Sequence, residues 1–134
     1  FIEPTQEVRD LKVKMKLTPI KHKIKGKKLV VIDDSIVRGT TSKRIVRMLK
    51  EAGAAEVHMR IASPASKGAC FYGVDTPNPD ELIASRMETE EICKYIGADS
   101  LAYLSIDGMV ESIKDKKNDY CFACFDLEYP IKVK

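Results

Sequence analysis

The stretch from Leu29 to Thr41 constrains the fold of this chain more than any other part of the sequence. Leu29-Val30-Val31-Ile32 is a run of four apolar residues, typical of a parallel strand that is covered on both faces. The chain then becomes polar at Asp33-Asp34-Ser35, and Gly39-Thr40-Thr41 leads into an amphipathic segment. This order predicts a buried strand, a short turn and the start of a helix, which is the arrangement of an α/β protein.

The chemistry of that turn indicates what it can bind. Backbone N–H groups at the start of a helix favour an anion, and the hydroxyls of Thr40 and Thr41 would lie beside them, so a phosphate suits the position. The carboxylates of Asp33 and Asp34 cannot bind phosphate, but they can hold sugar hydroxyls or Mg²⁺. The alternative is an ordinary strand–turn–helix with an acidic rim, as in response regulators.

The segments around this turn extend the α/β prediction. An apolar stripe predicts a helix from Thr41 to Gly53, where the glycine ends it, and alternation from Glu56 to Pro64 predicts the next parallel strand. Strand, helix and strand would form a right-handed βαβ unit. The later segments predict a helix start, a short helix, a short strand, another helix and a polar linker, at Asn78–Glu81, Thr89–Gly97, Leu101–Leu104, Asp107–Ile113 and Lys114–Asp119.

Residues 1–28 are strongly basic. They carry nine Lys and Arg against three Asp and Glu, although the whole chain has a net charge of only +3. Lysines alternate with apolar residues over 11–17 and again over 20–25, which predicts a basic hairpin or flap. No aromatic side chains are interleaved for base stacking, so a small phosphate-rich anion is a better partner than nucleic acid. His22 and His58 carry no catalytic signal.

The size of the chain limits it to one domain. Its 134 residues suffice for a single core, and a hydrophobic content of 44% with 32% charged residues is ordinary for a soluble protein. No apolar run approaches a membrane span and no signal-peptide pattern opens the chain, so we expect a cytoplasmic protein without a membrane partner. Phe1 is not a start methionine, and an α/β fold would normally place strands before Leu29, so we expect a piece of a longer protein.

The motif around Asp33 resembles a known family. VVIDDSIVRGTT is similar to the loop that binds phosphoribosyl pyrophosphate (PRPP) in type I phosphoribosyltransferases, and DDSIVRGTTSKRIV resembles its form in the glutamine PRPP amidotransferases. CFYGVDTP, DELIAS, IGADSLAYLS and DGMVESI resemble later segments of the same family. The resemblance runs from Phe1 to about Pro130. It implies a partial phosphoribosyltransferase fold, with a flap (1–28), an α/β core (29–118) and a CxxC tail (119–134), and without the N-terminal glutaminase domain.

The resemblance also implies an activity. Ammonia released from glutamine would displace pyrophosphate from PRPP to give 5-phosphoribosylamine, the first committed step of purine biosynthesis. Asp33 and Asp34 would hold the ribose hydroxyls and Mg²⁺, and Arg9 and Lys16 would act from the flap. The residues implied to bind PRPP are Asp33, Asp34, Ser35, Arg38, Gly39, Thr40 and Thr41. The full-length protein would be a homo-oligomer, and this piece alone would be incomplete for activity.

The four cysteines leave several alternatives open. The CxxC at Cys121 and Cys124 could belong to a zinc site, an iron–sulfur site, a disulfide or none of these. Many glutamine PRPP amidotransferases carry a [4Fe–4S] cluster, and the resemblance maps three of its ligands onto Cys70, Cys121 and Cys124, with the fourth upstream. Cys93 matches no ligand position. We therefore expect a labile or missing cluster, with Cys121 and Cys124 reduced or paired with each other.

The local sequence departs from the family near these thiols. Leu127 stands where the family usually has glycine, and Ala69 stands where it often has proline, which puts the turn geometry in doubt.

Two other functions remain open. The chain could be a salvage phosphoribosyltransferase, which shares the PRPP loop but not the downstream segments, or a non-catalytic PRPP-sensing module. A PRPP synthetase is a weaker third alternative.

Overall fold

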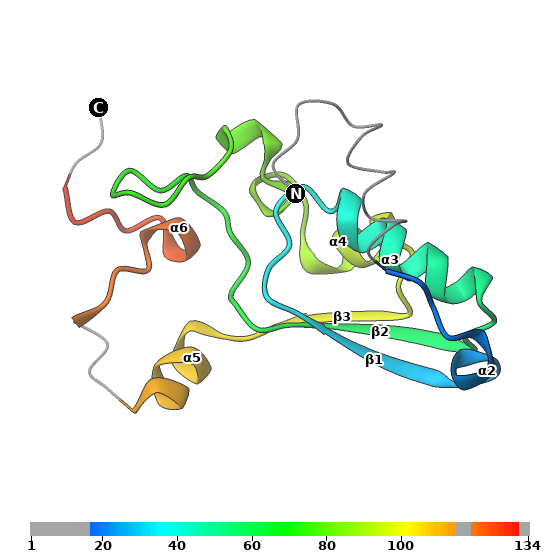
Figure 1. The fold of residues 1–134 in the computed structure, drawn as a ribbon. Coiled ribbons are helices and arrows are strands. Elements are labelled where there is room, and N and C mark those ends of the chain that lie inside the picture. Colours follow the sequence, from blue (N-terminus) through cyan, green and yellow to red (C-terminus); the bar gives the residue numbers. More distant parts are fainter. Residues whose placement is uncertain (1–16, 115–118, 132–134) are drawn as a thin grey trace.

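A three-stranded parallel sheet organises the fold. The computed structural model describes residues 17–114 and 119–131. Within them, strands β1 (Lys28–Asp33), β2 (Glu56–Ile61) and β3 (Ser100–Tyr103) pair in the order β1-β2-β3. Helices α3 (Thr40–Glu51) and α4 (Thr89–Ile96) lie together over one face of the sheet (Figure 1). The predicted parallel α/β architecture is confirmed.

The βαβ unit forms as the apolar periodicity predicts. Helix α3 connects two strands that pair in parallel, with Val31 opposite Met59. The helix ends before Gly53, whose φ of 95° is in the left-handed region that favours glycine. This unit puts the carboxyl end of β1 next to the N-terminus of α3, where the predicted site lies.

The second helix on the sheet is also set by local signals. Glu88 and Glu91 form a capping box at the start of α4, and Gly97 ends the helix with a φ of 75°. The helix predicted to start at Asn78 does not form as an α-helix. Two 3₁₀ turns, η1 (Pro79–Glu81) and η2 (Ile83–Ser85), take its place, and Ser85 Oγ donates to the carbonyl of Leu82.

The core lies between the sheet and the two helices. It gathers the buried residues Ile36, Val46, Val57, Met59, Ile61, Ile83, Ile92 and Ile96. The other face of β1 differs from the prediction, because Val30 and Ile32 are 65% and 75% exposed. The expectation that this strand is covered on both faces is therefore wrong for the described residues. β1 lies at the edge of the described sheet, and its outward side chains have no layer packed against them.

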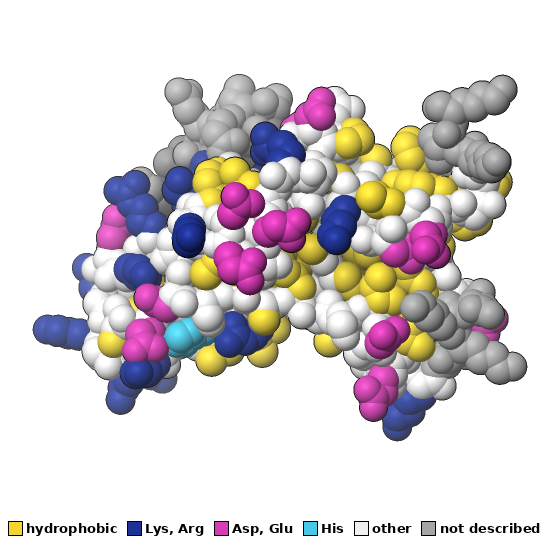
Figure 2. Space-filling model, turned by 180° about the vertical axis from the view of Figure 1, so that it is seen from behind, with side chains coloured by type: hydrophobic (Ala, Val, Ile, Leu, Met, Phe, Trp, Pro, Cys, Tyr) yellow, Lys and Arg dark blue, Asp and Glu magenta, His cyan; other side chains and the backbone are white. Residues whose placement is uncertain are grey.

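The described part of the basic N-terminal region contains one turn of helix. Lys21–Ile24 forms the single-turn helix α2 instead of the predicted extended segment, and it buries none of its residues. Residues 1–16 lie outside the described part of the chain, so the rest of the predicted flap has no structural test. Figure 2 shows Lys and Arg side chains gathered at the end of the molecule that carries α2 in Figure 1.

The C-terminal part of the chain lies beyond the carboxyl ends of the strands (Figure 1). Helices α5 (Ile106–Ile113) and α6 (Ala123–Asp126) form this part. The carbonyl of Cys124 accepts from the N–H groups of Lys67 and Gly68, and Tyr129 Oη donates to the carbonyl of Ala69. These bonds fix the CxxC segment against the loop that follows β2. None of the described helices has the length and apolar composition to cross a membrane.

Candidate functional site

The predicted PRPP residues gather around one cavity. The turn between β1 and α3 encloses about 270 Å³, and its lining consists of consecutive residues, 33–42. All seven residues named from the sequence, Asp33, Asp34, Ser35, Arg38, Gly39, Thr40 and Thr41, contribute to that lining. Neither carboxylate is turned away into the core, and the start of α3 is open to the cavity. The arrangement has the size and polarity of a small-anion site.

The start of α3 lacks a cap. Gly39 stands at the N-cap with a φ of 76°, so it has no side chain to accept from the first turn, and the first turn holds no acidic residue. The N–H groups of Thr40, Thr41 and Ser42 come before the repeating hydrogen bonds of the helix. An anion in the cavity would therefore meet donors and the positive end of the helix dipole.

Gly39 is also required by its neighbours. A Cβ at this position would lie 2.8 Å from Cδ1 of Ile83 and 3.1 Å from Cε1 of Tyr95. Ile83 is only 1% exposed, and its N–H donates to the carbonyl of Val37 at 2.8 Å. The loop is thus held from outside the cavity by the segment that contains η1 and η2. Nothing in the sequence around Gly39 indicates this second support.

Each carboxylate of the pair accepts from the backbone N–H of the residue that follows it. The N–H of Asp34 donates to Oδ1 of Asp33 at 3.1 Å, and the N–H of Ser35 donates to Oδ1 of Asp34 at 2.7 Å. Burial, together with the neighbouring Asp34 charge, raises the pKa of Asp33. A cation bound beside this pair would offset both effects, because it stabilises the ionised form.

Arg38 has a partner that the sequence did not indicate. Its Nε donates to Oε2 of Glu81 at 2.6 Å, across 43 positions of sequence. Arg38 lines the cavity, whereas Glu81 is not among the lining residues and stands in η1. The guanidinium group therefore bridges the loop and the segment that supports it.

The chemistry of this turn fits Mg²⁺ only together with a substrate. Within residues 17–114 and 119–131, no group of three or more His, Cys, Asp or Glu side chains is placed to hold a metal ion. Mg²⁺ needs fewer protein ligands, because it is usually held by one or two carboxylates and by the phosphates of a substrate. Asp33 and Asp34 supply those two carboxylates.

The thiols do not present an iron–sulfur site in the described residues. Cys70, Cys93, Cys121 and Cys124 are all free, so Cys121 and Cys124 are not paired with each other. Backbone N–H groups, above all that of Tyr72, lower the pKa of Cys70, whereas burial raises the pKa of Cys124. The three cysteines that the resemblance maps onto a [4Fe–4S] cluster, Cys70, Cys121 and Cys124, form no metal-holding group within the described residues.

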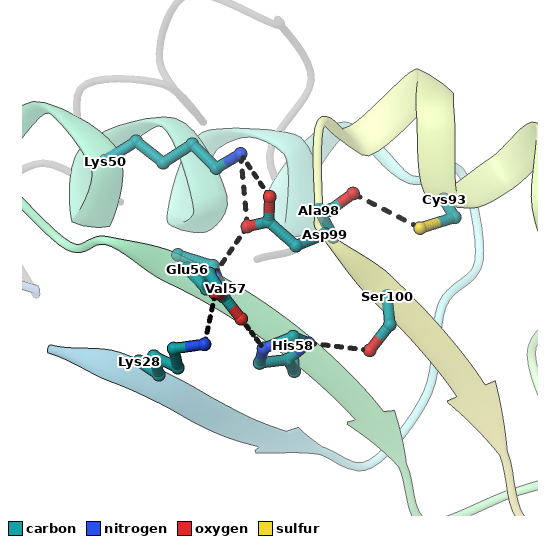
Figure 3. A network of polar contacts seen from close by, with 9 residues as sticks. All are labelled: Lys28, Lys50, Glu56, Val57, His58, Cys93, Ala98, Asp99 and Ser100. Atoms are coloured by element: carbon teal, nitrogen blue, oxygen red, sulfur yellow. Dashed lines mark hydrogen bonds and ion pairs between the residues drawn. The ribbon is translucent and has the colours of Figure 1, made fainter.

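The opposite edge of the sheet contains a network of paired side chains (Figure 3). Asp99 accepts from the N–H of Val57 at 2.7 Å and from Lys50 Nζ. His58 lies between Ser100 Oγ at 2.8 Å and Glu56 Oε2 at 2.9 Å, and Glu56 also pairs with Lys28. These contacts join the beginnings of all three strands to α3, so His58 has the structural role expected from the sequence.

Two residues assigned to catalysis cannot be placed. Arg9 and Lys16 lie outside the described residues, so their relation to the cavity stays a prediction. The two sides of the cavity that the structure does place are the carboxylate pair and the open helix start. Both derive from one continuous stretch of sequence, which is why the motif alone located them.

Comparison with known proteins relates this arrangement to one group of enzymes. The chain is 56% identical to a chloroplastic amidophosphoribosyltransferase of Vigna aconitifolia over 132 residues, which cover 98% of this chain and 27% of that protein. It is 53% identical to the amidophosphoribosyltransferase of Synechocystis over 99% of this chain and 27% of that protein. No family model matches the chain.

A solved structure supports the same relation. The glutamine PRPP amidotransferase from B. subtilis, complexed with ADP and GMP, matches with a TM-score of 0.83 and 48% identity, over all of this chain and 30% of that one. The chain is thus homologous to amidophosphoribosyltransferases over nearly its whole length. It spans about a quarter of the length of the curated relatives it matches.

Proposed function

We propose that this chain is the PRPP-binding part of an amidophosphoribosyltransferase that makes 5-phosphoribosylamine from PRPP and ammonia with release of pyrophosphate. The observation that carries the proposal is the cavity at the carboxyl end of β1, where a carboxylate pair faces an uncapped helix start. The similarity to amidophosphoribosyltransferases over nearly the whole chain supports it independently.

The geometry suits a sugar phosphate with two ends of different chemistry. The N–H groups at the start of α3 and the hydroxyls of Thr40 and Thr41 would hold the 5′-phosphate. Asp33 and Asp34 would accept from the ribose hydroxyls and so hold the ring in one orientation. Such positioning lowers the barrier because the reacting carbon is held in one orientation.

The substitution needs a stabilised leaving group more than a general base. The nitrogen of ammonia forms a bond to C1 while the bond from C1 to the pyrophosphate oxygen breaks, and the product amine then loses a proton. Mg²⁺ bound with the substrate would neutralise the charge that develops on pyrophosphate. Arg9 and Lys16, from the predicted flap, would approach the same group. Ammonia would come from a glutaminase part of the longer protein or from a separate chain.

The first test removes the carboxylate charges. Replacement of both Asp33 and Asp34 by Asn should abolish the Mg²⁺-dependent binding of PRPP, because a neutral amide holds the cation much more weakly than a carboxylate does. Isothermal titration calorimetry with PRPP, with and without Mg²⁺, measures this. Glu51→Gln, an exposed carboxylate at the far end of α3, is the matched control and should bind PRPP normally. An unchanged affinity in the double Asn variant would refute the assignment.

A second assay separates an enzyme from a binding module. The complete protein of which this chain is proposed to be a part should convert PRPP and ammonia to 5-phosphoribosylamine, with release of pyrophosphate. Binding of PRPP without turnover in that protein would instead favour a sensing module. Turnover with a purine or pyrimidine base in place of ammonia would favour a salvage phosphoribosyltransferase.

A further inference from the structure

Glu81 lies behind the PRPP cavity and contacts one of its lining residues. Three contacts join its segment to the loop: the ion pair from Glu81 to Arg38, the N–H of Ile83 donating to the carbonyl of Val37, and the packing of Ile83 against Gly39. Leu82 and Ile83 are each 1% exposed, so the segment is anchored in the core next to Glu81. The carboxylate therefore stands on a fixed support.

The ion pair leaves most N–H donors of the Arg38 guanidinium group available to a ligand. Arginine has five N–H donors in a planar group, and the contact to Glu81 uses Nε. The outer N–H groups of the two Nη atoms point in other directions than the Nε–H, so a phosphate oxygen can be bound without breaking the pair. A hydrogen bond between two ions also fixes the plane of the guanidinium group. In this geometry Glu81 orients Arg38 and does not compete with the ligand for it.

We propose that Glu81 is a positioning residue that orients Arg38 toward the phosphates of the bound ligand. The inference rests on the proposed function, because it assumes that the cavity holds PRPP. Arg38 is 41% exposed in its side chain, and an unrestrained arginine there would sample many rotamers. Glu81 removes that freedom before the ligand arrives, so the ligand does not have to order Arg38 itself.

The chain contains a matched control for this ion pair. Arg47 Nε donates to Glu51 Oε1 at 2.7 Å on the exposed side of α3, and neither residue lines the cavity. The two pairs use the same atom types at nearly the same distance. Exposed ion pairs contribute little to folding stability. Loss of Glu81 should therefore appear in ligand binding, and loss of Glu51 should appear in neither binding nor stability.

The experiment uses the complete protein of which this chain is proposed to be a part. Glu81→Ala, Glu81→Gln, Arg38→Ala, the Arg38→Ala/Glu81→Ala double variant and Glu51→Ala are compared by PRPP calorimetry with Mg²⁺, by KM and kcat, and by thermal unfolding. Glu81→Ala should raise Kd and KM for PRPP roughly tenfold with little change in melting temperature. Glu81→Gln should recover most of the affinity, because its amide oxygen can still accept from Nε.

The double variant gives the sharpest result. In the Arg38→Ala background, Glu81→Ala should have no further effect on PRPP binding, because the residue that it positions is gone. An additional loss there would overturn the proposal, as would unchanged or tighter binding by Glu81→Ala alone. If Glu81→Ala does not fold, weak binding by a folded Glu81→Gln would also contradict it. A wild-type protein that does not bind PRPP would overturn the proposed function and this inference together.

Discussion

The two edges of the same small sheet use charge in opposite ways. At the amino ends of the strands, Asp99, Lys50, Glu56 and Lys28 are paired with one another or with the backbone (Figure 3). At the carboxyl end of β1, Asp33 and Asp34 stand side by side, and the helix that faces them has no cap. The first edge is arranged for stability. The second keeps repelling carboxylates and open donors together, an arrangement that a ligand of matching chemistry would stabilise.

The largest difference in stability between the two edges should appear when a glycine is replaced. Gly39→Ala places a Cβ 2.8 Å from the buried Ile83 and forces alanine to a φ of 76°, which should cost about 2 to 4 kcal/mol of unfolding free energy. Gly26→Ala, at a φ of 73° with nothing within 4 Å, is the matched control and should cost about 1 kcal/mol. Urea unfolding of both variants measures this.

Equal losses in the two glycine variants would show that Ile83 yields to the extra carbon. The support that the η1 and η2 segment gives to the loop would then be weaker than the packing indicates. A larger loss at Gly39 would show that the two regions differ through tertiary contact and not through backbone conformation alone.

The next largest difference, in stability and in PRPP binding, should appear when a carboxylate is removed. Asp99→Ala removes the acceptor of the buried Val57 N–H and the partner of Lys50, so it should cost about 1 to 3 kcal/mol of stability without changing PRPP binding. Asp34→Ala is the counterpart at the other edge. Its side chain accepts from an exposed N–H of the loop, so stability should change by no more than about 0.5 kcal/mol while Mg²⁺-dependent PRPP binding is lost.

Chemical denaturation and calorimetry on the same two variants decide the point. A stability loss at Asp34 comparable to that at Asp99 would contradict the division between a stabilising edge and a binding edge. Loss of PRPP binding in Asp99→Ala would contradict it from the other side.

The contrast between the edges also explains what the sequence could predict. The strand, the carboxylate pair and the start of α3 are consecutive, so their identity fixes their geometry, and the motif predicted the cavity lining. Glu81 could not be predicted, because it meets Arg38 only through the packing of Ile83 against the loop. The helix α2 was wrongly predicted as extended, because Lys21 to Ile24 is too short for period two and period 3.6 to be distinguished.

The exposed side of β1 shows a different limit. Four apolar residues in a row predict burial on both faces, yet Val30 and Ile32 are exposed in the described structure. The apolar pattern reports which surfaces a strand offers for burial. It does not report whether the layer that covers them lies within this stretch of chain. The sequence therefore predicted the strand and its parallel pairing but not its surroundings.

The smallest difference should appear in the pH dependence of stability, where the two edges act with opposite signs. The hydrogen bond from Val57 lowers the pKa of Asp99 below its ordinary 3.8, so its contribution is present above that pH and is lost as the pH falls through the lowered pKa. Burial raises the pKa of Asp33 above 3.8, so the folded state gains a proton first, and stability from this group is lost as the pH rises through the raised pKa. The two pH dependences of stability meet near pH 3.8.

Urea unfolding from about pH 2 to about pH 6 measures both. Asp99→Asn should flatten the loss of stability on the acid side of pH 3.8, and Asp33→Asn should flatten the loss on the other side. If Asp33→Asn steepened the loss of stability with rising pH, the carboxylate would have to be stabilised in the folded chain by a partner, and the binding edge would be as fully paired as the opposite one.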